Sequence, residues 1–201
     1  PGVSDPGTRI VQAAIAAGMD VQVVPGPSAA VAAVSLSGFD TAAFTFAQVN
    51  WSTGTESEQT PLQVVSGNYF SVLGAQTALG RAFLPEEDLK PTPVVVLSHG
   101  FWERSLGRDP QIIGKTLTLN RTAFTVIGVA RQGFSGTILG GNPSGWVPMA
   151  MHDVVQPNFD WYEQRRGLFL FTLGRLKPEA SIEQASAQLR TVFAGLEQAF
   201  P

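Results

Sequence analysis

The segment "TPVVVLSHGFWERSLGRDPQIIGKTLTLNRTAFTVIGV" at residues 92–129 decides the fold class. Residues 92–98 form a short apolar run that predicts a buried strand, and residues 99–106 predict a helix that ends at Gly107. Residues 116–129 alternate apolar and polar side chains on two arms, which predicts a β-hairpin with Asn120-Arg121 at its turn. Asn tolerates the left-handed backbone of such a turn, whereas Arg is a poorer second residue than Gly. A hairpin beside a strand–helix unit indicates an α+β fold with a mixed sheet.

The flanking segments add short elements of both kinds. Residues 61–67 predict a strand, and residues 68–74 predict a short helix. Residues 81–88, "RAFLPEED", predict a turn into a short acidic helical start. The remaining predictions are one helical turn from Asp109-Pro110 through Ile113, a long Gly-rich loop at 130–145, a short strand at 145–149, and a strand buried on both faces at 167–176.

The clearest helix of the sequence covers residues 181–199. Ser181 and Gln184 have the spacing of a capping box. The apolar residues that follow recur at helical spacing and predict one buried stripe. This stripe consists of Ile182, Ala185, Leu189, Val192, Phe193, Leu196 and Phe200.

The composition excludes several classes of function. Of 201 residues, 14% are charged, against about 25% in an average globular protein. The net charge of −3 and the lack of a basic cluster argue against nucleic-acid binding. The chain has no Cys, which excludes disulfides and thiolate chemistry, and its two His lie in different segments, so we expect no metal site. The least polar run, residues 28–39, is too short to span a bilayer.

The N-terminal part differs in character from the rest. Residues 8–17 predict a helix, residues 21–24 a short buried strand, and residues 28–38 an Ala-rich helix. Such an α/β fragment needs a neighbouring parallel strand, whose expected supplier precedes Pro1. The character of the sequence changes between about 40 and 60, where the polar stretch "VNWSTGTESEQT" at residues 49–60 predicts a loop. We therefore place a domain boundary there, with 1–43 on one side and 44–201 on the other.

Three motifs invite a chemical interpretation and have a structural alternative. "GRDPQIIGKT" at 107–116 ends like a phosphate loop, but Asp109 stands where Gly is required and a strand follows instead of a helix. "PEED" at 85–88 groups acids that would need facing partners for metal or acid–base work, and an acidic helical turn explains them as well. His99 follows a strand and opens a helix without a catalytic constellation, and His152 falls in an irregular segment.

Several aromatic residues could be ligand platforms or core residues. Their spacing fits strands and helix faces, so core packing is the favoured interpretation for Trp102, Trp146, Trp161, Phe169 and Phe171. One group differs, because it lies in a loop together with two cations. This candidate partner contact comprises Trp161, Tyr162, Arg165 and Arg166.

Residues 44–201 resemble the periplasmic core domain of MacB-like ABC-transporter permeases. The resemblance rests on "VVSGNYFSVLGAQTALGRAFLPEED", on residues 93–130, on "GF" and "GT" within 133–137, on "WVPM", and on the segment from Gly174 to Pro201. It implies a non-catalytic domain between two transmembrane helices that contacts partners or cargo outside the inner membrane. It also implies that the first strand–helix portion of that domain is missing here, so the domain is incomplete on its N-terminal side.

Residues 1–39 resemble a different family, the S-adenosylmethionine-dependent tetrapyrrole methylases, in particular their 16S rRNA cytidine 2′-O-methyltransferase branch. "PGVSDPGTRIVQAAIAAG" and "VVPGPSAAVAAVSLSGF" carry this resemblance. The part of the family's motif that lies at the cofactor would precede residue 1, so we expect no functional cofactor site. The matching motif positions are Ser4, Asp5, Pro6, Gly7, Pro25, Gly26, Pro27 and Ser28.

These observations predict a non-catalytic extracytoplasmic domain of an ABC-transporter permease, with no cofactor and no metal. Its implied partners are the transmembrane and ATPase parts of the transporter and an adaptor protein or cargo. The alternative is a cytoplasmic methyltransferase fragment whose cofactor would be S-adenosylmethionine, and a third interpretation is an unrelated binding module that uses the loops at 130–166. Because the two families work in different compartments, we hypothesise a recombined or misassembled coding sequence.

Overall fold

The computed structural model describes residues 40–52, 57–137, 142–157, 170–176 and 180–199. The predicted helix–strand–helix unit of residues 8–38 lies outside these residues, as do the methylase motif positions. The described part forms a mixed sheet whose strands pair mostly antiparallel, together with a few helices, which confirms the α+β class. Within that part, no helix is both long and apolar enough to cross a membrane.

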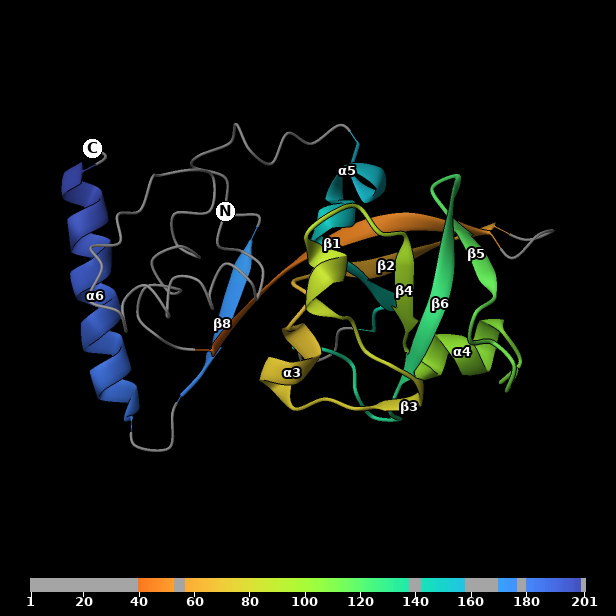
Figure 1. Ribbon diagram of the computed structural model, residues 1–201, viewed down its shortest axis with the longest axis horizontal. Coiled ribbons are helices and arrows are strands. Elements are labelled where there is room, and N and C mark those ends of the chain that lie inside the picture. The colour runs from red at the N-terminus through yellow and green to blue at the C-terminus, as the bar shows by residue number, and fades with distance from the viewer. Residues whose placement is uncertain (1–39, 53–56, 138–141, 158–169, 177–179, 200–201) are drawn as a thin grey trace.

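The centre of the fold is a closed ring of strands, which we call the strand ring (Figure 1). Each member pairs with the next, and the last returns to the first through the short pairing of Trp51 and Ser52 with Leu119 and Thr118. The remaining strands of the eight-stranded sheet, β3 and β8, attach outside the ring to β6 and β1. In ring order, its members are β1 (Asp40–Ser52), β2 (Ser57–Val65), β7 (Gly145–Pro148), β4 (Val94–Leu97), β6 (Thr122–Ala130) and β5 (Thr116–Leu119).

The prediction of a loop at residues 49–60 is wrong for its described residues, 49–52 and 57–60, which belong to strands. Most of this polar segment forms the antiparallel pair β1–β2, with Phe44 opposite Val65 and Ser52 opposite Ser57. The reason is a two-residue alternation, because Val49 and Trp51 are buried while Asn50 between them is exposed. The polar residues therefore form the outer face of a strand whose inner face is apolar. The strand β1 begins at Asp40 and so runs through the boundary placed after residue 43.

The segment from residue 92 to 129 folds largely as its pattern predicts. Strand β4 leads into α4 (His99–Ser105), where the side chain of Ser98 accepts a hydrogen bond from the N–H of Phe101. Strands β5 and β6 form the hairpin, and both turn residues have positive φ, 46° at Asn120 and 70° at Arg121. The helical turn expected after Asp109 is confirmed only in part: Asp109 Oδ1 caps the N–H of Gln111 and Ile112 N–H donates to Asp109 O, but the segment is a turn and not a helix.

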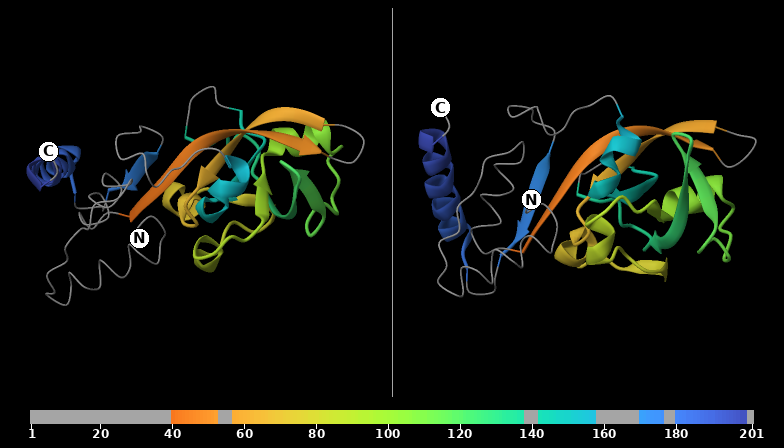
Figure 2. Two further views of the ribbon diagram at one scale, coloured as in Figure 1. Left: turned by 90° about the horizontal axis from the view of Figure 1, so that it is seen from above. Right: turned by 45° about the horizontal axis from the view of Figure 1, so that its top comes forward.

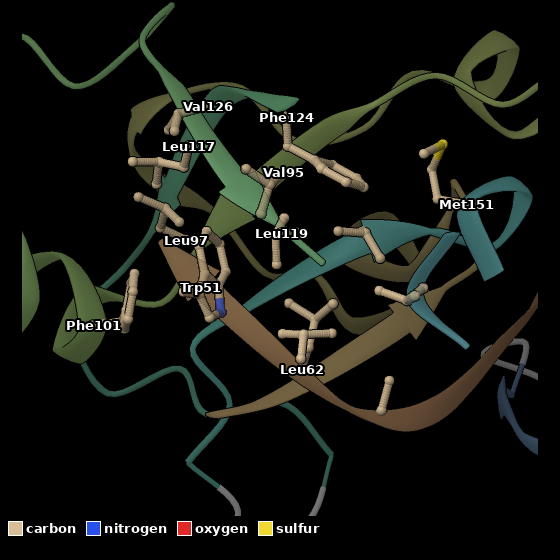
Figure 3. Close-up of a cluster of buried hydrophobic side chains, with 14 of the residues drawn as sticks. Trp51, Leu62, Val95, Leu97, Phe101, Leu117, Leu119, Phe124, Val126 and Met151 are labelled. Atoms are coloured by element: carbon tan, nitrogen blue, oxygen red, sulfur yellow. The ribbon is translucent and has the colours of Figure 1, made fainter. Parts of the chain in front are cut away.

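The hydrophobic core has two parts, one inside and one outside the strand ring. Neighbouring residues of a strand point to opposite sides, so Val95 and Leu97 pack inside while Val94 and Val96 pack outside. The outer part is covered by α3 (Tyr69–Leu73) and the segment around η1 (Pro85–Asp88). Figure 3 shows the inner part, whose labelled members are Trp51, Leu62, Val95, Leu97, Phe101, Leu117, Leu119, Phe124, Val126 and Met151.

Two further predicted elements need correction. His152 does not lie in an irregular segment: after η2 (Met149–Met151) it begins the single helical turn α5 (His152–Val155) and is buried. Strand β8 (Phe171–Arg175) is not buried on both faces, because it ends the sheet and the Phe171 side chain is 48% exposed. The short strand β3 (Thr77–Gly80), which the sequence analysis did not predict, pairs with β6.

The predicted C-terminal helix is present as α6 (Ile182–Ala199). Its capping box is confirmed, because Ser181 N–H donates to Gln184 Oε1 and Gln184 N–H donates to Ser181 Oγ. The predicted burial of its apolar stripe is wrong at its start, because Ile182 is 69% exposed. Figures 1 and 2 show α6 beyond β8, at the end of the molecule opposite the β5–β6 hairpin.

Candidate functional site

The candidate site is the place where β1 leaves the strand ring to pair with β8. We call it the β1–β8 junction and define it by Asp40–Phe44, Phe171–Arg175 and the connection from Ser66 to Asn68. The beginning of β1 pairs with β8, from Asp40 opposite Arg175 to Phe44 opposite Phe171, while the longer part from Phe44 to Ser52 pairs with β2. One 13-residue strand therefore belongs to both the ring and the outlying part of the sheet.

Side chains take the place of a neighbouring strand on the other edge of β1. Beyond the end of β2, Ala43 N–H donates to Ser66 Oγ at 3.0 Å, and Ala43 O accepts from Ser66 N–H at 2.9 Å. The amide of Asn68 donates to Thr41 O at 2.8 Å, and Ser66 Oγ donates to Asn68 Oδ1. Because buried backbone groups need partners, these bonds allow β1 to extend past its ring neighbour without a gap in hydrogen bonding.

An aromatic cluster covers the same junction. The rings of Phe44 and Phe171 stack with centroids 5.3 Å apart, and Phe46 meets Phe171 edge-on at 5.7 Å. Phe44 also contacts Tyr69 of α3 at 6.0 Å. The exposed ring of Phe171 thus lies against residues that belong to the ring, which ties β8 to the rest of the core.

A cation from β8 fixes the strand to α3. Arg175 Nε donates to Val72 O at 2.7 Å, at the C-terminal end of that helix. This end is closed by Gly74, whose φ of 66° is left-handed and whose N–H donates to Ser71 O. A cation at a helix C-terminus satisfies a carbonyl that lacks a partner within the helix and faces the negative end of the helix dipole.

A buried polar network anchors the loop between β6 and β7. Gln63 Oε1 accepts from Trp146 Nε1 at 2.6 Å and from Tyr69 Oη at 3.1 Å, while Tyr69 Oη lies 3.4 Å from Thr137 Oγ1. Burial raises the pKa of Tyr69, and hydrogen bonds offset part of this rise, so the phenol stays neutral and serves as a structural donor. The loop residue Gly136 lies over Gln63 and has a φ of 84°.

The acidic segment "PEED" forms the short helical turn η1, as one of the two interpretations predicted, and two of its acids also have partners that were not predicted. Glu87 is buried and makes two hydrogen bonds with the guanidinium of Arg81, at 2.7 and 3.0 Å, and one with Leu84 N–H. Asp88 Oδ2 accepts from Gly67 N–H at 2.9 Å. Among the described residues, no group of three or more His, Asp or Glu side chains could hold a metal ion.

Those remaining candidates that the structure describes show no catalytic grouping. Lys115 of the phosphate-loop-like segment pairs with Asp109, and β5 follows, so no helix N-terminus faces a ligand there. His99 begins α4, with its ring against Trp102 and its Nδ1 3.7 Å from Glu103. Trp146 is a core residue, as predicted. Trp161, Tyr162, Arg165, Arg166 and Phe169 lie outside the described residues.

The sequence analysis missed the residues that build the β1–β8 junction. Ser66 was included only as part of a predicted strand, Asn68 only as the start of a predicted helix, and Arg175 only as part of a strand. Their partners lie 23, 27 and 103 residues away in sequence. The available signal was the two-residue alternation of residues 47–51, which would have predicted β1 but not what it pairs with.

The profile of the MacB-like periplasmic core domain family matches residues 3–192, which is nearly the whole chain. The chain belongs to this family. It is therefore an extracytoplasmic domain of the MacB-like permease type. The matched range also includes residues on both sides of the boundary placed after residue 43.

Solved structures share the fold of this MacB-like domain. The periplasmic region of MacB from Actinobacillus actinomycetemcomitans superposes with a TM-score of 0.62 at 18% identity, covering 78% of this chain and 66% of that one. The extracellular domain of the noncanonic ABC-type transporter YknZ from Gram-positive bacteria gives a TM-score of 0.61 at 16% identity, covering 82% and 78%. At these identities the likeness concerns the fold alone.

The resemblance to the methylases also has a counterpart among known proteins. A segment of 46 residues is 56% identical to the ribosomal RNA small subunit methyltransferase I of Xylella fastidiosa and 50% identical to that of Leptospira borgpetersenii. It makes up 23% of the MacB-like domain's chain, but only 17% and 18% of the two enzymes. The chain thus spans less than a fifth of the methyltransferases that it matches.

Proposed function

We propose that this domain is a non-catalytic part of an ABC-transporter permease that couples transport to contact with an adaptor protein or cargo. In this proposal, the transmembrane and ATPase parts lie elsewhere in the transporter, and the β1–β8 junction transmits the position of β8 to the strand ring. The observation that carries it is the single strand β1, which pairs with β8 at one end and with β2 and β5 further along.

The bonding of the junction supports a mechanical role. A strand resists extension along its axis because its backbone is nearly fully extended, so a displacement of β8 reaches the ring through β1. The described residues supply anchors at three points of this path: the Ser66–Asn68 pair, the Phe44–Phe171 stack and the bond from Arg175 to Val72. None of these groups is a nucleophile or a general base aimed at open space, which favours a role in contact over one in chemistry.

The test compares two arginine variants in the complete permease, reconstituted with its ATPase. Arg175→Ala removes the bond to α3, whereas Arg190→Ala removes an exposed cation of α6 as a matched control. We expect the first variant to lose at least half of the adaptor- or cargo-stimulated ATP hydrolysis and the second to keep it. If Arg175→Ala is folded by circular dichroism and stimulated as fully as the unaltered permease, the junction does not couple.

The predicted partner contact requires a test of its own. We propose that Trp161, Tyr162, Arg165 and Arg166 touch the partner, on the basis of two aromatic residues beside two cations in one segment. Replacing Arg165 and Arg166 by Glu makes the net charge of the segment more negative by about four units. This change should weaken co-purification with the adaptor in a salt-dependent way. Unchanged co-purification at low salt would exclude this segment as the contact.

A second candidate function is favoured by the methyltransferase match alone. Under it, the N-terminal residues up to about 43 would be a separate unit that takes part in S-adenosylmethionine chemistry. Calorimetric titration with S-adenosylmethionine tests this candidate. A dissociation constant below roughly 100 μM, which corresponds to a binding free energy of about −5.5 kcal/mol, would establish a cofactor site. We expect no heat of binding.

A further inference from the structure

A partly buried carboxyl group joins three segments that are distant in sequence. Asp88 is the last residue of η1, and its Oδ2 accepts the N–H of Gly67, between β2 and α3. The backbone N–H groups of Met149 and Ala150, in η2, also act on this carboxyl group. The contact with Gly67 is tight, because a Cβ added there would lie 3.3 Å from Asp88 Cβ. We call this contact the Asp88 junction.

The second oxygen of this carboxyl group has weaker partners than the first. Asp88 Oδ1 is buried, and no donor of the described residues makes a hydrogen bond of normal geometry to it. A buried carboxylate needs several donors or a cation, since water no longer solvates it. The neutral acid needs fewer donors.

The charged groups around the junction do not neutralise Asp88. On η1 itself, Glu87 is occupied by Arg81, and Glu86 is exposed and of the same sign. The β2–α3 connection contributes Ser66, Gly67 and Asn68, none of which titrates in this range. After η2, His152 places Nδ1 on Met149 O at 3.0 Å and Nε2 on Asp153 at 2.9 Å, so its ring is directed to these partners.

Burial raises the pKa of Asp88 from 3.8 to about 6, while the N–H groups of Gly67, Ala150 and Met149 oppose part of the rise. The folded state therefore keeps a proton between about pH 4 and 6 that the unfolded chain has released. Consequently, the stability that this group contributes is complete below pH 4 and is lost as the pH rises toward 6.

We propose that the Asp88 junction is a pH-sensitive contact. The neutral form of Asp88 holds η1, the β2–α3 connection and η2 together, and ionisation of Asp88 loosens this contact. The loosening follows from solvation, because a carboxylate with one oxygen unmatched gains most by admitting water between the three segments. The inference concerns the fold of the domain and does not depend on the proposed coupling function.

The test combines a direct titration with a measurement of local opening. The ¹³C shift of the Asp88 carboxyl carbon, followed by NMR in the complete chain, should report a midpoint near pH 6 instead of near 4. Hydrogen exchange of the Gly67, Met149 and Ala150 amides, corrected for the intrinsic pH dependence of exchange, should show protection falling by up to about 100-fold between pH 4 and 7, the ratio that a two-unit pKa shift allows.

Two variants separate this device from general effects of pH. Asp88→Asn keeps an acceptor for Gly67 N–H and cannot ionise, so protection of these amides should no longer change with pH. Glu86→Gln, an exposed acid on the same helical turn, should behave like the unaltered chain. A carboxyl midpoint near pH 4, or the same loss of protection in Asp88→Asn, would overturn the proposal. If Asp88→Asn fails to fold, the titration of the Asp88 carboxyl group in the unaltered chain decides the matter alone.

Discussion

The turn of the β5–β6 hairpin allows a prediction in which two neighbouring substitutions have opposite signs. Arg121 holds a φ of 70° and Asn120 one of 46°, both in the left-handed region. For a residue with a Cβ, that region costs roughly 1–2 kcal/mol, whereas Gly adopts it freely but loses about 0.5–1 kcal/mol of chain entropy on folding. Arg121→Gly should therefore raise the free energy of unfolding by about 0.5–1 kcal/mol.

Asn120→Gly should have the opposite effect, although it also removes a side chain from a left-handed position. Asn120 Oδ1 accepts from Asn50 N–H at 2.9 Å, and Asn120 Nδ2 donates to Val155 O at 3.0 Å, which ties the turn to β1 and α5. Each such hydrogen bond contributes about 0.5–1.5 kcal/mol net. Losing both hydrogen bonds costs more than the variant gains in backbone strain, because Asn already tolerates the left-handed conformation. We therefore expect the free energy of unfolding to fall by about 1–2 kcal/mol.

Urea unfolding followed by tryptophan fluorescence measures both variants. For a domain of this size, 1 kcal/mol corresponds to a shift of roughly 2–4 °C in the melting temperature, which thermal unfolding can verify. The reasoning fails if Arg121→Gly is less stable than the unaltered chain at an unchanged slope against urea. That result would mean that the Arg121 side chain contributes more than its backbone costs.

Three further substitutions test the contacts around the β1–β8 junction and the anchored loop. Gly136→Ala should lower stability by about 2 kcal/mol, as measured by urea unfolding, because its φ is 84° and its Cβ would lie 2.6 Å from Gln63 Oε1. Asn68→Ala should cost about 1–3 kcal/mol in the same assay, since the buried carbonyl of Thr41 loses its donor. Arg175→Ala should lower the free energy of unfolding by only about 1 kcal/mol but should speed hydrogen exchange of the β8 amides, because β8 loses its bond to α3. Unchanged exchange of these amides would contradict the role of this bond.

Sequence patterns predicted the elements whose partners are close along the chain. The β5–β6 hairpin pairs residues 116–119 with 122–125, and its alternation and its turn residue indicate the same structure. The α6 capping box needs only residues three positions apart, and it forms as expected. Strand β1 was missed because Gln48, Asn50 and Ser52 on its outer face resemble a loop, although Val49 and Trp51 are buried.

The candidate site could not be predicted in the same way, because it depends on closure of the strand ring. No pattern near Asn68 indicates that it will donate to Thr41 O, and none near Arg175 indicates that the end of α3 will lie beside β8. The partial burial of Asp88 likewise follows from the packing of η1 against η2, which lie about 60 residues apart in sequence. The composition of "PEED" predicted an acidic turn and could not distinguish the exposed Glu86 from the buried Glu87.

The relation between the two resemblances can be tested on the protein from its native source. The profile of the permease domain begins at residue 3, and β1 runs through the boundary placed after residue 43, so continuity of this region bears directly on a misassembled coding sequence. There is no Lys or Arg between Arg9 and Arg81, and the first Glu is Glu56. Digestion with trypsin and a glutamyl endopeptidase should therefore release residues 10–56 as one peptide. Its detection by mass spectrometry would show that one polypeptide carries both parts. Two separate sets of peptides that end on either side of the boundary would instead support misassembly.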